Sequence, residues 1–293
     1  MLTFAEIAGN DLVEYKKSVD NDVDLLHIYH SIDTKTKSLF PAAYHAFYKA
    51  IIDGKTIHFV VRINRFIHPI LFFCSSRKLS LTEDQYAKVF KAFSDTVTII
   101  NLKEPLITRG PDFIINPFNK WRSHNYTIAP IINAPVYLYY MNKEQTEMAK
   151  QFKFNLPYGY SFCEDVTTQE AVLINSKWKN SGPGDERQTA AKIKYMPYGC
   201  VKYKEDPVSW VLNDPAGTLT NLYTEPDRRR KGLGLAVEMK AANKIIALNR
   251  VPFKLIEQSN KSFLNSTDKG KYWSRWNYDS GEPVNVIVTV PVP

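Results

Sequence analysis

Residues 224–240, TEPDRRRKGLGLAVEMK, place four consecutive cations and two glycines directly before a helical pattern. The first turn of a helix leaves backbone N–H groups without helical partners and carries a partial positive charge. Glycine removes the Cβ that would keep a phosphate oxygen away from the main chain, and Arg228 to Lys231 add positive charge beside it. This order of residue types predicts a cradle for a pyrophosphate group.

The glycine spacing excludes two common nucleotide-binding loops. Arg229-x-x-Gly232-x-Gly234 is neither the G-x-x-x-x-G-K-[ST] of a P-loop nor the G-x-G-x-x-G of a dinucleotide-binding fold. Basic helix starts beside glycines also occur as plain turns. The elements on either side of the loop therefore decide between the two interpretations.

The second half of the chain predicts elements in the order β-α-α-β-β-β-α-β-α-β-β. Apolar runs bounded by turn residues indicate the strands, and Thr167 with Glu170 forms a capping box that starts a helix. The pyrophosphate loop joins a strand at 218–224 to a long amphipathic helix that ends near Asn249. The other expected strands are 160–164, 198–204, 207–213, 252–258, 271–277 and 285–290, and further helices are expected at 185–195 and from Asn260.

The first half reads as mixed α and β structure, with strands expected at 56–63, 69–76 and 96–101. Thr82 and Gln85 form a second capping box, which starts a helix between the last two of these strands. Five prolines fall within 105–135 and argue against a long helix there. We therefore expect an irregular, ordered connection at 105–135 between a domain at 1–135 and a domain at 136–293.

The order of elements around the basic loop resembles the GNAT superfamily of acyl-CoA-dependent N-acyltransferases. PVSWVLND, YTEPDRRRKGLG, SNKSF and YWSRWN resemble the glycine N-acyltransferase-like family in particular, over roughly 158–278. The resemblance implies an α/β fold with a mixed sheet, GNAT-like in the C-terminal half, and an N-terminal α/β domain that is a degenerate copy. It also implies transfer of an acyl group from CoA to the amine of a small acceptor, an amino acid such as glycine.

The resemblance assigns roles to particular positions. The loop wraps the CoA pyrophosphate, the strand before it pairs with the pantetheine arm and polarises the thioester carbonyl, and the asparagine of SNKSF hydrogen-bonds the pantetheine. The implied loop residues are Arg229, Arg230, Lys231, Gly232, Leu233 and Gly234; the strand residues are Leu222, Tyr223 and Thr224; the asparagine is Asn260.

The catalytic groups are harder to assign than the cofactor loop. All six histidines precede residue 125, so the acyltransferase-like half has no histidine to act as general base. Glu225 and Glu257, near the ends of two strands, are the best-placed acids, and Tyr272 is an approximate substitute for the family's tyrosine that protonates the leaving thiolate. The glycine-conjugating enzymes have a glutamate base at the position of Thr218. A threonine hydroxyl cannot accept and hold an additional proton at pH 7, so it cannot replace that base.

Two other functions remain open from the sequence. Thr218 favours a protein that binds acyl-CoA without efficient transfer, and the RRRK run could bind nucleic acid. The formal net charge of +8 is spread along the chain, which suits a point-like anionic ligand better than a long polyanion. We expect no nucleic-acid partner, no membrane span, no metal site and three buried thiols, in a cytoplasmic or, alternatively, a mitochondrial protein.

Overall fold

The structure is a computed structural model that describes residues 1–20, 22–179, 181–182 and 184–292. Its first half contains β1 (Leu2–Ile7), α1 (Asp11–Ser18), α2 (Leu26–Thr36), β2 (Ala43–Ile52), β3 (Lys55–Asn64), β4 (Ile70–Cys74), α3 (Glu83–Thr96), β5 (Ile107–Pro111), α4 (Asp112–Asn125) and β6 (Ile131–Tyr140). After α5 (Lys143–Lys150), the second half contains β7 (Tyr160–Phe162), α6 (Thr168–Ser176), α7 (Asp185–Tyr195), β8 (Tyr198–Tyr203), β9 (Asp206–Asn213), β10 (Thr218–Thr224), α8 (Leu233–Ala247), β11 (Phe253–Glu257), α9 (Lys261–Asp268), β12 (Ser274–Arg275) and β13 (Asn285–Pro291).

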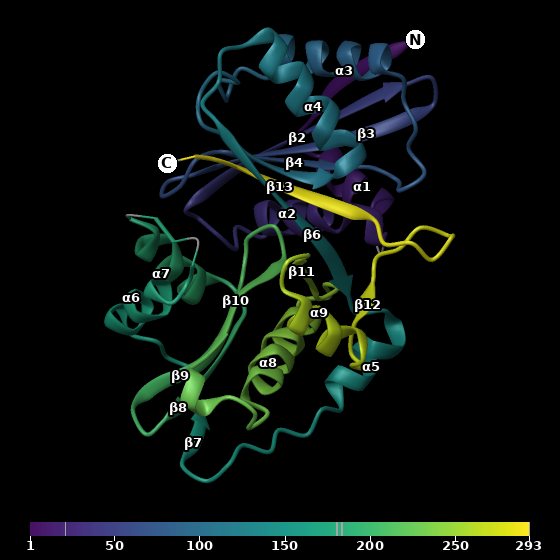
Figure 1. The fold of residues 1–293 in the computed structure, drawn as a ribbon. Helices are drawn as coiled ribbons and strands as arrows, with labels where there is room; N and C mark the ends of the chain where they lie inside the picture. The colour runs from purple at the N-terminus through teal and green to yellow at the C-terminus, as the bar shows by residue number, and fades with distance from the viewer. Residues whose placement is uncertain (21, 180, 183, 293) are drawn as a thin grey trace.

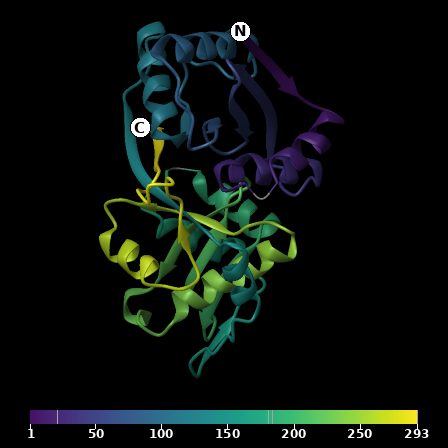
Figure 2. The ribbon, with the colours of Figure 1, turned by 90° about the vertical axis from the view of Figure 1, so that its right-hand side faces the viewer.

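The two halves repeat the same element order, β-α-α-β-β-β-α-β-α-β, apart from the short extra strand β12. Their strands join in one mixed sheet, ordered β1-β2-β3-β4-β5-β13-β6-β11-β10-β9-β8-β7, with β12 beside β6. Figure 1 shows β6 and β13 running between the two halves, and Figure 2 shows α1 and α2 on the side of the first half that faces the second.

The last strand of each half pairs with the other half. β13 is antiparallel to β5, with Val286 opposite Pro111, and β6 is antiparallel to β11, with Tyr140 opposite Phe253. β6 and β13 also pair with each other, from Asn285 opposite Tyr137 onward. The two repeats are therefore connected by backbone hydrogen bonds across the whole sheet, and β6 spans the expected domain boundary at 135/136.

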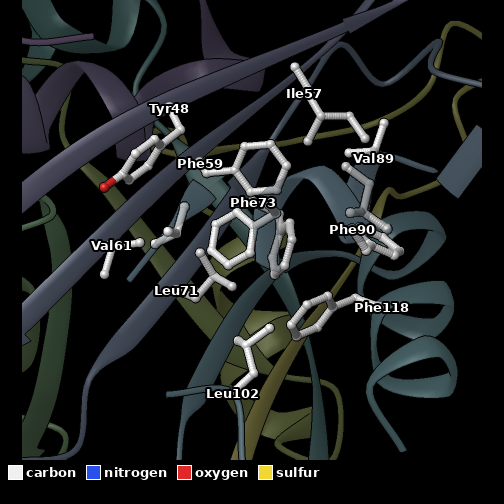
Figure 3. Close-up of a cluster of buried hydrophobic side chains, with 14 of the residues drawn as sticks. Tyr48, Ile57, Phe59, Val61, Leu71, Phe73, Val89, Phe90, Leu102 and Phe118 are labelled. Carbon is white, nitrogen blue, oxygen red and sulfur yellow. The ribbon is translucent and has the colours of Figure 1, made fainter. Parts of the chain in front are cut away.

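The core of the first half is rich in phenylalanine and lies between the sheet and helices α3 and α4 (Figure 3). Thr82 caps α3 as expected, because its side chain accepts from the Gln85 N–H while the Gln85 side chain accepts from the Thr82 N–H. The capping box places the apolar stripe of α3 toward the sheet. The buried aromatic residues of this core include Phe59, Phe73, Phe90, Phe93 and Phe118.

Two expectations for the first half were wrong. No strand forms at 96–101 in the described chain; Val97 and Ile100 are instead buried in a loop against the core. The expected irregular segment at 105–135 contains β5, the 14-residue helix α4 and the start of β6. Pro117 lies inside α4 and removes one helical hydrogen bond, but burial of Ile114, Ile115 and Phe118 on one face keeps the helix intact.

The elements expected in the second half were largely confirmed. Thr167 and Glu170 form the capping box of α6, Asn260 caps α9, and α8 follows the basic loop. The strand expected at 271–277 is reduced to β12, of two residues. In the part of the chain that the structure describes, no helix combines the length and the apolar character that crossing a membrane requires.

Helix α8 packs directly on β8, and Gly199 makes this contact possible. A Cβ at Gly199 would lie 2.1 Å from the backbone oxygen of Val237 in α8. We expect Gly199→Ala to lower the free energy of unfolding by about 1–3 kcal/mol or more, because either backbone must move. Urea denaturation measures this loss. Gly182→Ala is the control, since its added methyl lies at an ordinary 3.7 Å from Asp185 Oδ2; equal effects at both positions would contradict the prediction.

Candidate functional site

Strands β10 and β11 separate to form a V-shaped opening. They are parallel and pair only at Thr218 opposite Phe253 and Leu219 opposite Lys254. A bulge follows in β10, where Asn221 has φ +56° and the register with β9 shifts. Beyond Leu219, the described part of β11 offers β10 no further partner. The three residues expected to pair with pantetheine, Leu222, Tyr223 and Thr224, therefore line one side of the opening.

The basic loop begins where β10 ends and turns into the N-terminus of α8. Gly232 takes φ +77° as the residue before the helix, and no atom lies within 4 Å of the position that a Cβ would occupy. Among the described residues, no hydrogen bond uses the backbone N–H groups from Arg230 to Leu235. The loop thus presents a row of unpartnered N–H groups to open space, as anion binding at a helix N-terminus requires.

Aromatic side chains hold two of the loop cations. The Arg228 guanidinium lies 4.2 Å from the Tyr203 ring centroid, and Lys231 Nζ donates to the Tyr160 hydroxyl at 3.1 Å. Lys231 and then Arg228 lower the pKa of Tyr160. Arg229 Nε donates to the Thr224 carbonyl at 3.0 Å. Sequence reasoning missed the two tyrosines, although both occur in strands that it predicts, at 160–164 and 198–204; the structure pairs these strands, with Tyr160 opposite Tyr203.

The two candidate acids lie at the open end of the V, and both pair with lysines. Glu225 lies 3.2 Å from Lys177 Nζ and accepts from the Tyr223 hydroxyl at 3.2 Å. Glu257 lies 2.5 Å from Lys179 Nζ. The segment after α6 therefore reaches both strand ends and spans the opening, which the sequence had not indicated.

Tyr272 and Asn260, the remaining expected site residues, have structural partners, and so does Trp273 in the YWSRWN segment. Tyr272 packs its ring 5.7 Å from Phe152, and within the described chain it forms no hydrogen bond to either candidate acid. Asn260 Oδ1 accepts from the Phe263 N–H at 3.3 Å as the cap of α9. Trp273 donates to Glu238 at 3.3 Å beside the buried pair Glu238–Lys254, which joins α8 to β11.

The closed end of the V is covered by the first half. Thr218 is buried, and its Oγ1 accepts from Arg109 Nη1 of β5 at 3.2 Å. His27 and His30 of α2 contact the carbonyls of Ala216 and Val251 at 3.4 and 3.0 Å. Burial lowers the pKa of His27 to about 3 and holds that of His30 well below its ordinary value. The first half thus contributes histidines near the site, but they are neutral and enclosed.

The corresponding opening in the first half is filled. β4 and β5 pair from Ile70 opposite Ile107 onward, and a cavity of about 20 Å³, enough for about one water, remains between their ends. Trp276 lines this cavity and donates to Asp24 at 2.7 Å. The loop after β4, residues 75–81, contains no glycine. These features leave the first half without a second anion cradle of the same kind.

Comparisons with known proteins identify the fold of the chain. A family model described as FR47-like protein matches residues 198–264, from β8 into α9. A solved structure of a Drosophila melanogaster protein is 13% identical with a TM-score of 0.76, over 99% of this chain and 98% of that one. A tandem GNAT protein from the clavulanic acid biosynthesis pathway is 10% identical with a TM-score of 0.50, over 99% and 97% of the two chains. The chain has a tandem GNAT fold.

A third solved structure agrees with this assignment. It is a putative acetyltransferase of the GNAT family from Novosphingobium aromaticivorans, 13% identical with a TM-score of 0.50, over 93% of this chain and all of that one. The protein is thus N-acetyltransferase-like in fold, with its FR47-like segment in the second half. Among the described residues, no group of three metal-binding side chains is present.

Proposed function

We propose that the protein transfers an acyl group from acyl-CoA to the amine of a small acceptor, an amino acid such as glycine, as its resemblance to the glycine N-acyltransferase-like family implies. The observation that carries the proposal is the V-shaped opening beside the glycine loop, whose N–H groups from Arg230 to Leu235 have no partner within the described chain. A pyrophosphate fits the loop, and an extended pantetheine arm fits the unpaired edge of β10.

The transfer needs three contributions from the protein, namely stabilisation of an oxyanion, a base and a proton donor. The N–H of Glu225 donates to Val208 of β9, so by alternation along the strand the N–H groups of Leu222 and Thr224 face the opening. These two N–H groups stabilise the oxyanion that forms when the amine attacks the thioester carbonyl. Glu225 accepts the proton that the ammonium must lose, because amines of pKa near 10 are protonated at neutral pH. As the C–N bond forms and the C–S bond breaks, the nitrogen loses a second proton to solvent to give the amide. The departing thiolate takes a proton, for which Tyr272 is the candidate donor, and Tyr272 regains one from solvent.

The proposal is tested by thermal unfolding with CoA, acetyl-CoA and benzoyl-CoA, beside release of free thiol with a panel of amino acids. We expect each CoA species to stabilise the protein and thiol to appear with one class of amine. Stabilisation without thiol release would support the second candidate, an acyl-CoA-binding protein without efficient transfer. Thr218 favours that candidate, since it is buried and engaged by Arg109 where the related enzymes have a glutamate. No stabilisation by any CoA species would overturn both.

Replacement of Glu225 tests its role as base. We expect Glu225→Gln to lower kcat about a hundredfold to ten-thousandfold while stabilisation by CoA is unchanged, because the amide cannot accept the proton. Steady-state thiol release measures the rate. Asp227→Asn is the control, as Asp227 is the exposed neighbour that pairs with Arg228 at 3.0 Å. A normal rate in Glu225→Gln would assign the base elsewhere, with Glu257 as the next variant.

A further inference from the structure

A cluster of charged side chains is enclosed where the two halves meet, and it contains more cations than anions. Arg62 of β3 donates to both oxygens of Asp214, at 2.5 and 3.1 Å. Lys192 of α7 lies 4.0 Å from the same carboxylate, and Arg109 of β5 lies beside Thr218. Three cations therefore share one carboxylate. His45 does not change this balance, because burial, and then Arg62, lower its pKa to about 3.

Several donors in this cluster are unused. Both Asp214 oxygens already accept from Arg62, and one also accepts from the Ala216 N–H at 2.9 Å. Within the described residues, Arg109 Nε has no hydrogen-bond partner, and the Lys192 ammonium lies 4.0 Å from Asp214, beyond hydrogen-bond distance. Burial lowers the pKa of Lys192 to about 8. Enclosed cations that outnumber their counterions are costly, so Arg109 and Lys192 favour the binding of a second anion beside them.

Arg109 and Lys192 lie toward the face of β10 that is packed by α6 and α7. Leu219 packs on the α8 side of the sheet, so its neighbour Thr218 faces the α6 and α7 side. Tyr223, at the open end of the V, packs on that same side. The Trp178 ring lies 5.9 Å from Lys192 Nζ, while its neighbours in the chain, 177 and 179, pair with the acids at the open end. The face of β10 on the α6 and α7 side therefore connects the charged cluster with the open end of the V, where the acyl transfer is proposed.

We propose that Arg109 and Lys192 bind the carboxylate of the acceptor, so that the amine of an amino acid points along β10 toward the thioester. This subsite deepens the proposed function and rests on it. The subsite also gives the first half a part in substrate recognition, since Arg109 belongs to β5 and its side chain contacts Thr218 of the second half. The amide of the same acceptor would supply no second negative charge to these cations.

The test uses the reaction product, so that it does not depend on turnover. N-acetylglycine carries the carboxylate, and N-acetylglycinamide has the same shape without the charge. Titration calorimetry, with and without saturating CoA, should show that the wild type binds the acid about tenfold to a hundredfold more tightly than the amide. Arg109→Gln and Lys192→Gln should each remove most of this preference, and Arg109→Lys should keep most of it because it retains the charge.

The control separates recognition from stability. Arg122 is another buried arginine, which donates to the carbonyls of Leu102 and Glu104 at 2.6 and 2.7 Å. Arg122→Gln should destabilise the first half and leave the preference for the acid unchanged. Equal binding of acid and amide to the wild type, or a full preference in Arg109→Gln, would overturn the subsite. Failure of the proposed function gives a different result, the absence of both CoA binding and thiol release.

Discussion

Gly232→Glu is expected to abolish detectable CoA binding. The new side chain would project into the open space in front of the unpartnered N–H groups, where its carboxylate would compete with the pyrophosphate and repel it. Loss of two charge-assisted hydrogen bonds alone costs about 3–6 kcal/mol, roughly a hundredfold to ten-thousandfold in affinity. Thermal stabilisation and calorimetry with CoA measure the effect.

A matched control distinguishes loss of the site from backbone strain. Gly54, in the turn between β2 and β3, has φ +76° and nothing within 4 Å of its Cβ position, so Gly54→Glu introduces the same charge and nearly the same strain far from the loop. It should unfold at a temperature similar to that of Gly232→Glu and bind CoA normally. CoA binding by Gly232→Glu at wild-type affinity would show that the pyrophosphate does not lie in this loop.

Asp214→Asn is expected to destabilise the protein by about 3–5 kcal/mol, because it removes the one carboxylate that faces three enclosed cations in the described structure. Urea unfolding should give this loss. Asp95→Asn is the control, since the pair Lys91–Asp95 is exposed on α3 and should contribute about 0.5 kcal/mol or less. A loss as small as that of the control would mean that the cluster contributes little to stability.

The pH dependence of the Asp214 effect follows from the sign of its pKa shift. Arg62 and Lys192 hold the pKa of Asp214 well below its ordinary value, although burial alone would raise it. A carboxylate with a depressed pKa in the folded state stabilises the protein above its pKa in the unfolded state, about 3.9, and loses this contribution as pH falls through the folded value. The difference between wild type and Asp214→Asn should therefore be constant from about pH 5 to 7, below the pKa of about 8 of Lys192, and shrink in acid.

Local signals in the sequence predicted the parts of the fold that depend on neighbouring residues. The capping boxes at Thr82 and Thr167 depend on contacts three residues apart, and both formed. The turn of the basic loop depends on the positive φ of Gly232, which glycine adopts without steric cost whatever its neighbours are. For the same reason, the order of strands and helices in the second half was predictable from periodicity and turn residues.

Tertiary packing decided the elements that the sequence did not predict. Val97 and Ile100 satisfy a strand pattern, yet they are buried as a loop against α3 and the sheet. Pro117 argues against a helix, yet the packing of α4 outweighs one lost hydrogen bond. The contact between Arg62 and Asp214 joins residues 152 apart, and no local pattern indicates it. The candidate acceptor subsite was therefore accessible only from the structure.

The pairing of β6 and β13 with strands of the opposite half affects how the chain folds during synthesis. β13 leaves the ribosome after all other strands of this sheet, and until it does, β5 of the first half has an unpaired edge. Such an edge is a template for pairing with another chain, so nascent and C-terminally truncated forms should be prone to aggregate. The first repeat, although translated early, cannot complete its sheet until residues 285–291 have been translated, so its folding waits for the whole second repeat.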